Sequence, residues 1–268
     1  MIEIDKIYNE DNLVTMEKMD SSFVDMIMTS PPYNTNLKAK GGATLERGGN
    51  YLNYGIVRYD SFVDVMSNDD YIDFTRKRFL LFDKILKKDG VICYNISYGS
   101  ENADCMFRTI NDIIVNTVFT IADVIVWKKK SALPNSVSPN KLTRITEFVF
   151  VFVRKEDYQT FFCNKQVTSL RKSGQKAYEN IFNFIEAPNN NGTCDLNKAT
   201  YSKELCYKLI RLYCRDGGTV YDPFMGTGTT AVACKENGFH YIGSEISSKQ
   251  CEYAENRIKP IKQQLQIF

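Results

Sequence analysis

The sequence predicts an α/β fold in which a mostly parallel sheet is covered by helices on both faces. Short apolar, β-prone segments alternate along the chain with segments of helical spacing, an order typical of such sheets. The 268 residues are 43% hydrophobic, which is enough to bury a sizeable core as one domain. No run of 18 or more apolar residues occurs, so we expect no membrane-spanning segment.

The first half of the chain is expected to contain two buried strands and two helices. The apolar run 24–28 predicts a strand that stops at a pair of prolines. Residues 71–86 have helical spacing, and the following Gly90 suits a helix C-cap. Residues 91–96 predict a strand from their β-branched and aromatic content, and 105–116 predict a further helix.

The second half continues the alternation, and two irregular stretches interrupt the pattern along the whole chain. We expect strands at 122–127, 146–153, 219–222 and 240–243, and helices at 202–214, about 229–236 and 249–258. Residues 38–57 contain five glycines, and residues 164–198 are polar. We therefore expect one domain over residues 1–268, with a mobile loop at about 38–57 and an inserted segment at about 155–200.

A Thr-Ser-Pro-Pro-Tyr motif at residues 29–33 follows the first predicted strand, at the sheet edge where parallel sheets bind ligands. Two consecutive prolines fix the backbone and remove two N–H donors, which leaves stiff carbonyl acceptors. The Pro31 carbonyl and the Ser30 side chain could accept both hydrogens of an NH2 group while Tyr33 stacks on the ring that carries it. Such contacts would make the amine nitrogen a better nucleophile. The alternative is a strand exit that the prolines only stiffen.

A glycine turn at residues 222–230, Asp-Pro-Phe-Met-Gly-Thr-Gly-Thr-Thr, joins a predicted strand to a predicted helix. Gly226 and Gly228 let the backbone turn tightly and approach a ligand. The turn lacks the Gly-Lys-Ser/Thr of a phosphate loop and the third glycine of the dinucleotide fingerprint. Glu245 ends the next strand, where an acidic residue commonly binds ribose hydroxyls. Together these features predict a nucleoside cofactor without phosphates, although Glu245 alone would be an ordinary loop acid.

The two motifs and their order resemble the amino-methyltransferases of restriction-modification systems, in the permuted β-class arrangement. In that arrangement the catalytic motif precedes the target-recognition segment, and the cofactor glycine motif lies near the C-terminus. The resemblance covers most of the chain outside the two irregular stretches. It implies a Rossmann-like, S-adenosylmethionine-dependent methyltransferase fold with circularly permuted motifs, and a site-specific DNA methyltransferase activity with S-adenosyl-L-methionine as cofactor and a flipped target base.

Carried over position by position, the resemblance implies two sets of site residues. The catalytic set is Ser30, Pro31, Pro32 and Tyr33. The cofactor-binding set is Asp11, Thr29, Asp222, Phe224, Gly226, Thr227, Gly228, Thr229 and Glu245. Asp11 matches the second position of a family Gly-Asp pair whose glycine is Glu10 here, and an isolated acid at such a place is often only a helix N-cap. Residues 198–201, Lys-Ala-Thr-Tyr, stand where the family often has a histidine-proline pair.

The residue before the two prolines, Ser30, bears on which base is the target. Relatives with Asp or Asn before the prolines mostly modify adenine N6, whereas Thr-Ser-Pro-Pro-Tyr resembles the cytosine-N4 subgroup. We therefore expect transfer to N4 of cytosine, with adenine N6 as the alternative. A non-catalytic DNA-binding module and methylation of RNA or of protein glutamine remain as further alternatives. Methylation of carbon 5 of cytosine is disfavoured, because it needs a cysteine nucleophile and none of the eight cysteines follows a proline.

An uneven charge distribution favours a polyanionic partner. The net charge is +2, but residues 126–180 hold 11 Lys or Arg against 4 Asp or Glu. Most charge runs are only solvated faces, yet this one adjoins the predicted site. The candidate DNA-binding residues are Lys128, Lys129, Lys130, Lys141, Arg144, Arg171 and Lys172, and the segment 155–200 would recognise the target sequence.

Other features bear on partners and compartment. The N-terminus lacks the apolar core of a signal peptide, so we expect a cytoplasmic or nucleoid-type (nuclear-type) location. One histidine and no Cys-x-x-Cys pair predict no metal site. By analogy with the family, a homodimer and a restriction endonuclease acting on the same site are further candidate partners, which the sequence does not decide.

Overall fold

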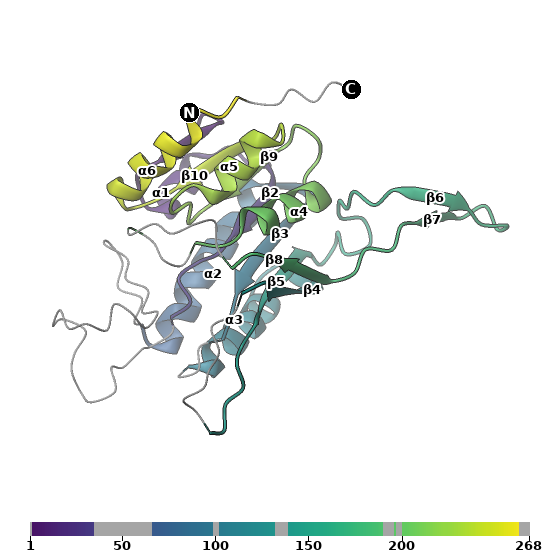
Figure 1. Ribbon diagram of the computed structural model, residues 1–268, viewed down its shortest axis with the longest axis horizontal. Helices are drawn as coiled ribbons and strands as arrows, with labels where there is room; N and C mark the ends of the chain where they lie inside the picture. The colour runs from purple at the N-terminus through teal and green to yellow at the C-terminus, as the bar shows by residue number, and fades with distance from the viewer. Residues whose placement is uncertain are drawn as a thin grey trace.

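The computed structural model describes residues 2–34, 66–98, 102–131, 139–189, 196 and 200–262 (Figure 1). The predicted mobile loop at 38–57 lies outside the described residues. The described chain contains ten strands and six helices. The strands are β1 Lys6–Tyr8, β2 Val24–Thr29, β3 Leu86–Ile96, β4 Phe119–Lys129, β5 Thr146–Arg154, β6 Val167–Leu170, β7 Lys176–Tyr178, β8 Phe184–Ala187, β9 Thr219–Asp222 and β10 His240–Ser244. The helices are α1 Asn12–Lys18, α2 Asn68–Ile85, α3 Ala103–Asn116, α4 Lys203–Tyr213, α5 Thr229–Glu236 and α6 Ser248–Ile258.

Eight strands form one sheet in the order β1-β10-β9-β2-β3-β5-β4-β8. Every neighbouring pair is parallel except the two that involve β5, which runs antiparallel to β3 and to β4. The carboxyl ends of the parallel strands and the beginning of β5 therefore lie along one edge of the sheet. The mostly parallel α/β architecture that the sequence predicts is confirmed.

Helices cover both faces of this sheet and enclose two apolar clusters (Figure 1). Side chains of α4, α5 and α6 pack on one face, with Leu209 and Cys234 fully buried there. Side chains of α1, α2 and α3 pack on the other face, where the ring of Phe79 lies 5.3 Å from that of Phe152 and 5.6 Å from that of Tyr94. Because apolar side chains cover both faces, the central strands are buried throughout, as the burial of all six residues of β2 shows.

The chain order brings the two predicted motifs together at the centre of the sheet. β2 ends at Thr29 and β9 ends at Asp222, and the two strands pair directly through Met26 and Val220. Residues 29–33 and 222–230 are therefore neighbours at the carboxyl edge, although almost 200 residues separate them in sequence. A topological switch of this kind is where open α/β sheets bind ligands.

The turn between α2 and β3 differs from the prediction. Gly90 is not a helix C-cap: α2 is capped by Leu86 in an extended conformation, and Gly90 lies inside β3. A Cβ at Gly90 would approach the Asp25 carbonyl oxygen to 2.9 Å, so the position needs glycine for close packing. The positive φ belongs instead to Asp89, at 57°.

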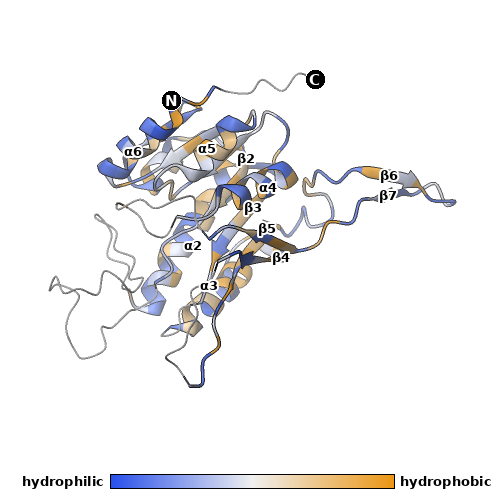
Figure 2. Cartoon of the chain, in the orientation of Figure 1, coloured by the Kyte–Doolittle hydropathy of each residue, from blue (hydrophilic) through white to orange (hydrophobic). Residues whose placement is uncertain are grey.

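The described part of the segment 155–200 contains a projecting two-stranded ribbon, β6–β7, which we call the arm (Figure 1). The two strands are antiparallel, and their side chains are almost all exposed. Figure 2 shows that hydrophilic and hydrophobic stretches alternate along the arm. Leu170 and Tyr178 are exposed there. The sequence contained no pattern strong enough to predict these short strands.

Candidate active site

The proline turn after β2 presents one carbonyl differently from the other. Pro31 and Pro32 are both buried. The hydroxyl of Tyr71, on α2, donates a 2.6 Å hydrogen bond to the carbonyl of Pro32. No described residue donates a hydrogen bond to the carbonyl of Pro31. Of the two stiff carbonyls, that of Pro31 is therefore the one available to a guest.

The Ser30 hydroxyl lies 3.0 Å from that of Tyr33, within the same turn. The Tyr33 hydroxyl also lies 3.1 Å from Oε2 of Glu147 and 3.2 Å from Oδ1 of Asn95. Lys129 completes the group by donating a hydrogen bond to Oε1 of Glu147. β3, β4 and β5 supply these three side chains at the same sheet edge, so the proline turn is joined to a network of polar groups.

The glycine turn after β9 requires its glycines. Gly226 and Gly228 have φ of 54° and 82°, a region that side chains with a Cβ rarely adopt. A Cβ at Gly228 would also come within 2.8 Å of the Cβ of Ala254 on α6. The turn therefore holds backbone and the α5 N-terminus close to the neighbouring helix, with Thr227 and Thr229 buried beside it.

Glu245 follows β10 and faces this turn. Its Oε2 accepts a 2.8 Å hydrogen bond from the Gly226 N–H, and its Oε1 accepts a 2.9 Å bond from the Ser247 N–H. The side chain is half-buried. A carboxylate held this firmly by backbone donors is positioned in advance, and its remaining lone pairs can accept from hydroxyl groups of a ligand.

Asp222 is fully buried at the end of β9. Its carboxylate accepts hydrogen bonds from the Phe224 N–H at 3.0 Å and from the hydroxyls of Tyr201 and Thr230 at 3.1 and 2.5 Å. Burial raises the pKa of Asp222 from 3.8 to about 6, with these hydrogen bonds opposing the rise. Tyr201 stands where relatives often have a histidine-proline pair, and it fills that place as a donor to Asp222.

Asp11 and Phe224 meet at a buried arginine. Asp11 is the N-cap of α1, with its side chain accepting a 2.8 Å bond from the Leu13 N–H, and Oδ2 lies 3.8 Å from the guanidinium of Arg78. That guanidinium packs 3.4 Å from the ring centre of Phe74 and 5.5 Å from that of Phe224. Burial lowers the pKa of Arg78 to about 10. Its Nε has no hydrogen-bond partner among the described residues, so this end of the site has a buried donor that they leave unused.

Asn12 provides a second buried group of this kind. Its Nδ2 donates a 2.8 Å bond to the carbonyl of Pro223 and so links α1 to the glycine turn. Its Oδ1 is buried and has no hydrogen-bond partner in the part of the chain that the structure describes. Because buried polar atoms are nearly always satisfied in native proteins, unsatisfied ones beside a glycine turn are an observation that favours a ligand there.

The candidate DNA-binding residues fall into three places. Lys128, Lys129 and Lys130 lie at the end of β4 and form ion pairs with Glu186, Glu147 and Glu204 respectively, so Lys129 belongs to the polar network around Tyr33. Lys141 and Arg144 are exposed before β5, and the guanidinium of Arg144 lies 5.3 Å from the ring centre of Tyr98. Arg171 and Lys172 are exposed at the turn of the arm.

Comparison with known proteins agrees with this arrangement of two adjacent motifs. The family model described as DNA methylase matches residues 24–256. Type II methyltransferase M.HinfI of Haemophilus influenzae is 24% identical over 97% of this chain and 69% of its own length. The solved structure of PvuII DNA methyltransferase (cytosine-N4-specific) has a TM-score of 0.68 at 17% identity, covering 96% of this chain and 90% of that one. The M1.HpyAVI–SAM complex has a TM-score of 0.57 at 20% identity, covering 94% and 98%.

The sheet edge brings a glycine turn with a fixed carboxylate next to a proline turn with an available carbonyl, an arrangement that suits transfer of a group to an amine. With the family model matching residues 24–256, the chain belongs to the N6/N4 DNA methylase family. It is a DNA methyltransferase of the restriction-modification type, and its cofactor is S-adenosylmethionine. This confirms the expected methyltransferase fold and the expected cofactor.

The residues at the glycine turn fit this cofactor. Its ribose hydroxyls are donors that suit the fixed carboxylate of Glu245, and its adenine is a flat ring that suits the side chain of Phe224. The unused Oδ1 of Asn12 and Nε of Arg78 offer one acceptor and one donor nearby. When bound, the cofactor supplies an electrophilic methyl group. The protein's own groups then have to orient an amine toward it and accept the amine's hydrogens.

Two absences are plain in the part of the chain that the structure describes. None of its helices is long and apolar enough to cross a membrane. Its histidines, cysteines and acidic residues form no cluster of three or more that could hold a metal ion.

Among the side chains that the structure brings to the site, the sequence-based prediction missed Asn12, Tyr71, Arg78, Asn95, Glu147 and Tyr201. Asn95 could have been noticed, because it is a polar residue near the end of a predicted apolar strand. Glu147 was recognisable only once β5 was known to run antiparallel to β3. Arg78 and Tyr201 reach the site through helix packing and a long connection, for which one sequence gives no signal.

Proposed function

We propose that this protein transfers a methyl group from S-adenosylmethionine to the exocyclic N4 amine of cytosine at a specific DNA site. The observation that carries the proposal is the position of Ser30 in the proline turn, where its hydroxyl lies 3.0 Å from the Tyr33 hydroxyl. This turn follows β2, which pairs directly with β9, the strand that leads into the glycine turn. Ser30 and the Pro31 carbonyl offer two acceptors for the two hydrogens of one amine. Asp222, Phe224, Gly226, Gly228 and Glu245 bind the cofactor in this proposal, together with Asp11, Thr29, Thr227 and Thr229.

Cytosine is preferred to adenine for two reasons. The residue before the prolines is a serine, as in the cytosine-N4 subgroup that the sequence resembles, and not an aspartate or asparagine. The solved structure with a TM-score of 0.68 is of a cytosine-N4-specific enzyme, which supports the same choice. Adenine N6 is the second candidate, because it too is an exocyclic amine on a conjugated ring.

The DNA would bind along the sheet edge and the arm. A base inside a duplex cannot reach the proline turn, so the target nucleotide is flipped out at a cost of a few kcal/mol. Arg144 and the lysines at the end of β4 contact the backbone, and the arm with Arg171 and Lys172 contacts the groove, which a two-stranded ribbon can enter. The homodimer and the cognate endonuclease remain proposals from the family analogy.

Mass spectrometry of nucleosides tests this function directly. Unmethylated phage DNA is incubated with S-adenosylmethionine and either the wild type or a Ser30→Ala/Tyr33→Ala variant, then digested to nucleosides. We expect N4-methylcytosine with the wild type and none with the variant. N6-methyladenine would keep the reaction and overturn the choice of base. No methylated base in double- or single-stranded DNA, with cofactor binding intact, would contradict the DNA substrate.

A further inference from the structure

The Tyr33 hydroxyl is flanked by two acceptors and has one proton. Oε2 of Glu147 lies 3.1 Å from it and Oδ1 of Asn95 lies 3.2 Å from it. A carboxylate and an amide oxygen can only accept. Tyr33 therefore donates its proton toward this pair, and its oxygen is left to accept from elsewhere.

The orientation of Asn95 is set by its other contacts. Its Nδ2 donates to the carbonyl of Phe148 at 3.0 Å and lies 3.4 Å from Oε2 of Glu147. Reversing the amide would place its oxygen against these two acceptors, so the network assigns Oδ1 to the Tyr33 side. Asn95 is fully buried, which leaves it no solvent to compensate for a wrong orientation.

Glu147 is held in place from its other oxygen. Lys129 donates to Oε1 and supplies a counter-charge, and the Glu147 side chain is only 14% exposed. The carboxylate thus has one oxygen bound to the ammonium and the other facing Tyr33 and Asn95. Removing either charge would leave the other in a poorly solvated place.

Ser30 is the last member of this chain of hydrogen bonds. Its hydroxyl lies 3.0 Å from a Tyr33 oxygen whose own proton points toward Glu147 and Asn95. The proton of Ser30 then points to Tyr33, and the lone pairs of Oγ face away from it. The geometry points to Glu147 as a positioning residue that fixes Ser30 as a hydrogen-bond acceptor. Through that polarity it makes the site select an amine over a carbonyl oxygen.

This inference rests on the proposed function and specifies how its site recognises the target. Cytosine and adenine present an N–H donor at the exocyclic position, whereas their deaminated counterparts, uracil and hypoxanthine, present a carbonyl oxygen there. A serine fixed as acceptor binds the first pair and repels the second. A site built for a donor loses much of its affinity for an analogue that lacks one, because a buried group is then left unpaired.

A double-mutant cycle tests whether Glu147 acts through Tyr33. The variants are Glu147→Gln, Tyr33→Phe and the two combined, assayed for methyl transfer to unmethylated phage DNA and for cofactor affinity by calorimetry. We expect Glu147→Gln to lower kcat about 10- to 100-fold, because glutamine can donate to Tyr33 and release the polarity of Ser30. Cofactor affinity should stay within about twofold, and in the Tyr33→Phe background the added substitution should cost less than about threefold. If the double variant instead loses kcat by the product of the two single-variant losses, the residues act independently and the inference is overturned.

A binding measurement gives a readout that a merely structural role would not change. Once the modified position is mapped with the wild type, two duplexes are compared that differ only in the target base and its deaminated counterpart. The wild type should prefer the amine, and Glu147→Gln should reduce that preference about tenfold. Equal weakening toward both duplexes, or an unchanged ratio, would contradict the assigned role.

The controls separate three outcomes. Glu236→Gln is the control: it removes a carboxylate on α5, away from Tyr33, that pairs with Lys203 of α4 at 2.7 Å. This variant should leave kcat and the ratio of the affinities for the two duplexes unchanged. Thermal melting of each variant reports folding, and Glu147→Asp keeps the charge if the glutamine variant does not fold. A wild type that methylates no base would refute the proposed function itself, whereas an active wild type with multiplying losses would refute only the role of Glu147.

Discussion

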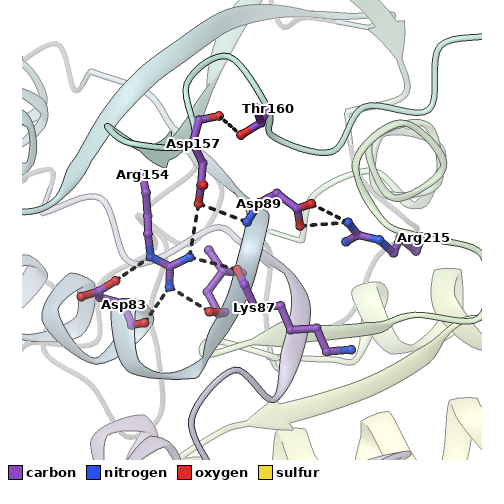
Figure 3. A network of polar contacts seen from close by, with 8 residues as sticks. Asp83, Lys87, Asp89, Arg154, Asp157, Thr160 and Arg215 are labelled. Atoms are coloured by element: carbon purple, nitrogen blue, oxygen red, sulfur yellow. Dashed lines mark hydrogen bonds and ion pairs between the residues drawn. The ribbon is translucent and has the colours of Figure 1, made fainter.

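The two edges of the sheet differ in how completely their polar groups are paired. At the amino edge, where β2, β3 and β9 begin, charged side chains form a connected network (Figure 3). Arg154 donates to the side chain and carbonyl of Asp83 and to the carbonyls of Leu86 and Lys87. Oδ2 of Asp157 accepts from the Asp89 N–H at 3.1 Å. Each of these groups has its partner within the protein.

The carboxyl edge holds groups whose pairing is incomplete or costly. Within the described ranges, Nε of Arg78 and Oδ1 of Asn12 are buried and have no hydrogen-bond partners, and the carboxyl of Asp222 is buried with a raised pKa. Such groups cost stability in the free protein and gain partners when a ligand binds. The contrast indicates that one edge is built for stability and the other for chemistry, and it can be tested by changing one edge at a time.

The largest expected effect is at the carboxyl edge. Replacing Ser30 and Tyr33 together with alanine should lower kcat about 10⁴-fold, about 5 kcal/mol of transition-state stabilisation, because both the acceptor and the stacking ring are lost. The melting temperature should change by less than about 3 °C. Single-turnover methylation and calorimetric melting measure the two quantities. If this variant were inactive because it had unfolded, the carboxyl edge would also be needed for stability and the contrast between the two edges would fail.

The amino edge should show the opposite response. Arg154→Met removes five hydrogen bonds or ion contacts from a buried guanidinium and leaves the Asp157 carboxylate poorly compensated. We expect a loss of about 3–5 kcal/mol in the free energy of unfolding, measured by urea denaturation. kcat and cofactor affinity of the folded variant at low temperature should match those of the wild type. A selective loss of activity would show that the two edges are coupled.

The raised pKa of Asp222 predicts a pH dependence that sharpens the comparison. Its pKa is about 6 in the folded protein and 3.8 as the ordinary value, so between these values the native state holds a proton that the unfolded chain has released. The free energy of unfolding from this group therefore falls as pH rises from about 4 to 6, by about 3 kcal/mol in all, and then levels off. Subtracting the curve of Asp222→Asn from that of the wild type isolates this change. Parallel curves would contradict the raised pKa.

The smallest effect concerns the arm. Arg171→Ala combined with Lys172→Ala should weaken DNA binding about tenfold at low salt and reduce the slope of log affinity against log salt by about 2. The matched control is Lys249→Ala with Lys259→Ala, which removes two exposed cations at the two ends of α6 and should change neither quantity. Fluorescence anisotropy with a labelled duplex measures both. If both double variants lost DNA affinity equally, the arm would contribute only non-specific positive charge.

Much of the fold was predictable because the relevant signals are local. The strand at 24–28 and the helix at 229–236 follow from apolar runs and from a glycine turn that fixes the helix start, and the structure has β2 at Val24–Thr29 and α5 at Thr229–Glu236. β1, α1 and the arm were missed because they are short and have little periodicity. The error at Gly90 has a physical cause as well: the glycine is required by contact with Asp25 across the sheet, which no local pattern records.

The candidate site divides in the same way. Ser30, Tyr33, Asp222 and Glu245 lie in motifs that a sequence can display, and pairing of β2 with β9 brings them to one edge. Glu147 depends on the direction of β5, and Tyr201 depends on where a long connection returns to the sheet. These residues orient the others, and their positions are properties of the topology and not of any short pattern.

Hydrogen–deuterium exchange with and without S-adenosylhomocysteine tests the central claim, that the carboxyl edge is the ligand-binding edge and the amino edge is not. We predict increased protection over residues 222–230 and 245–248, where backbone donors face the glycine turn, and none over 83–89 or 154–157. Protection of the amino-edge peptides with no change at 222–230 would contradict the account.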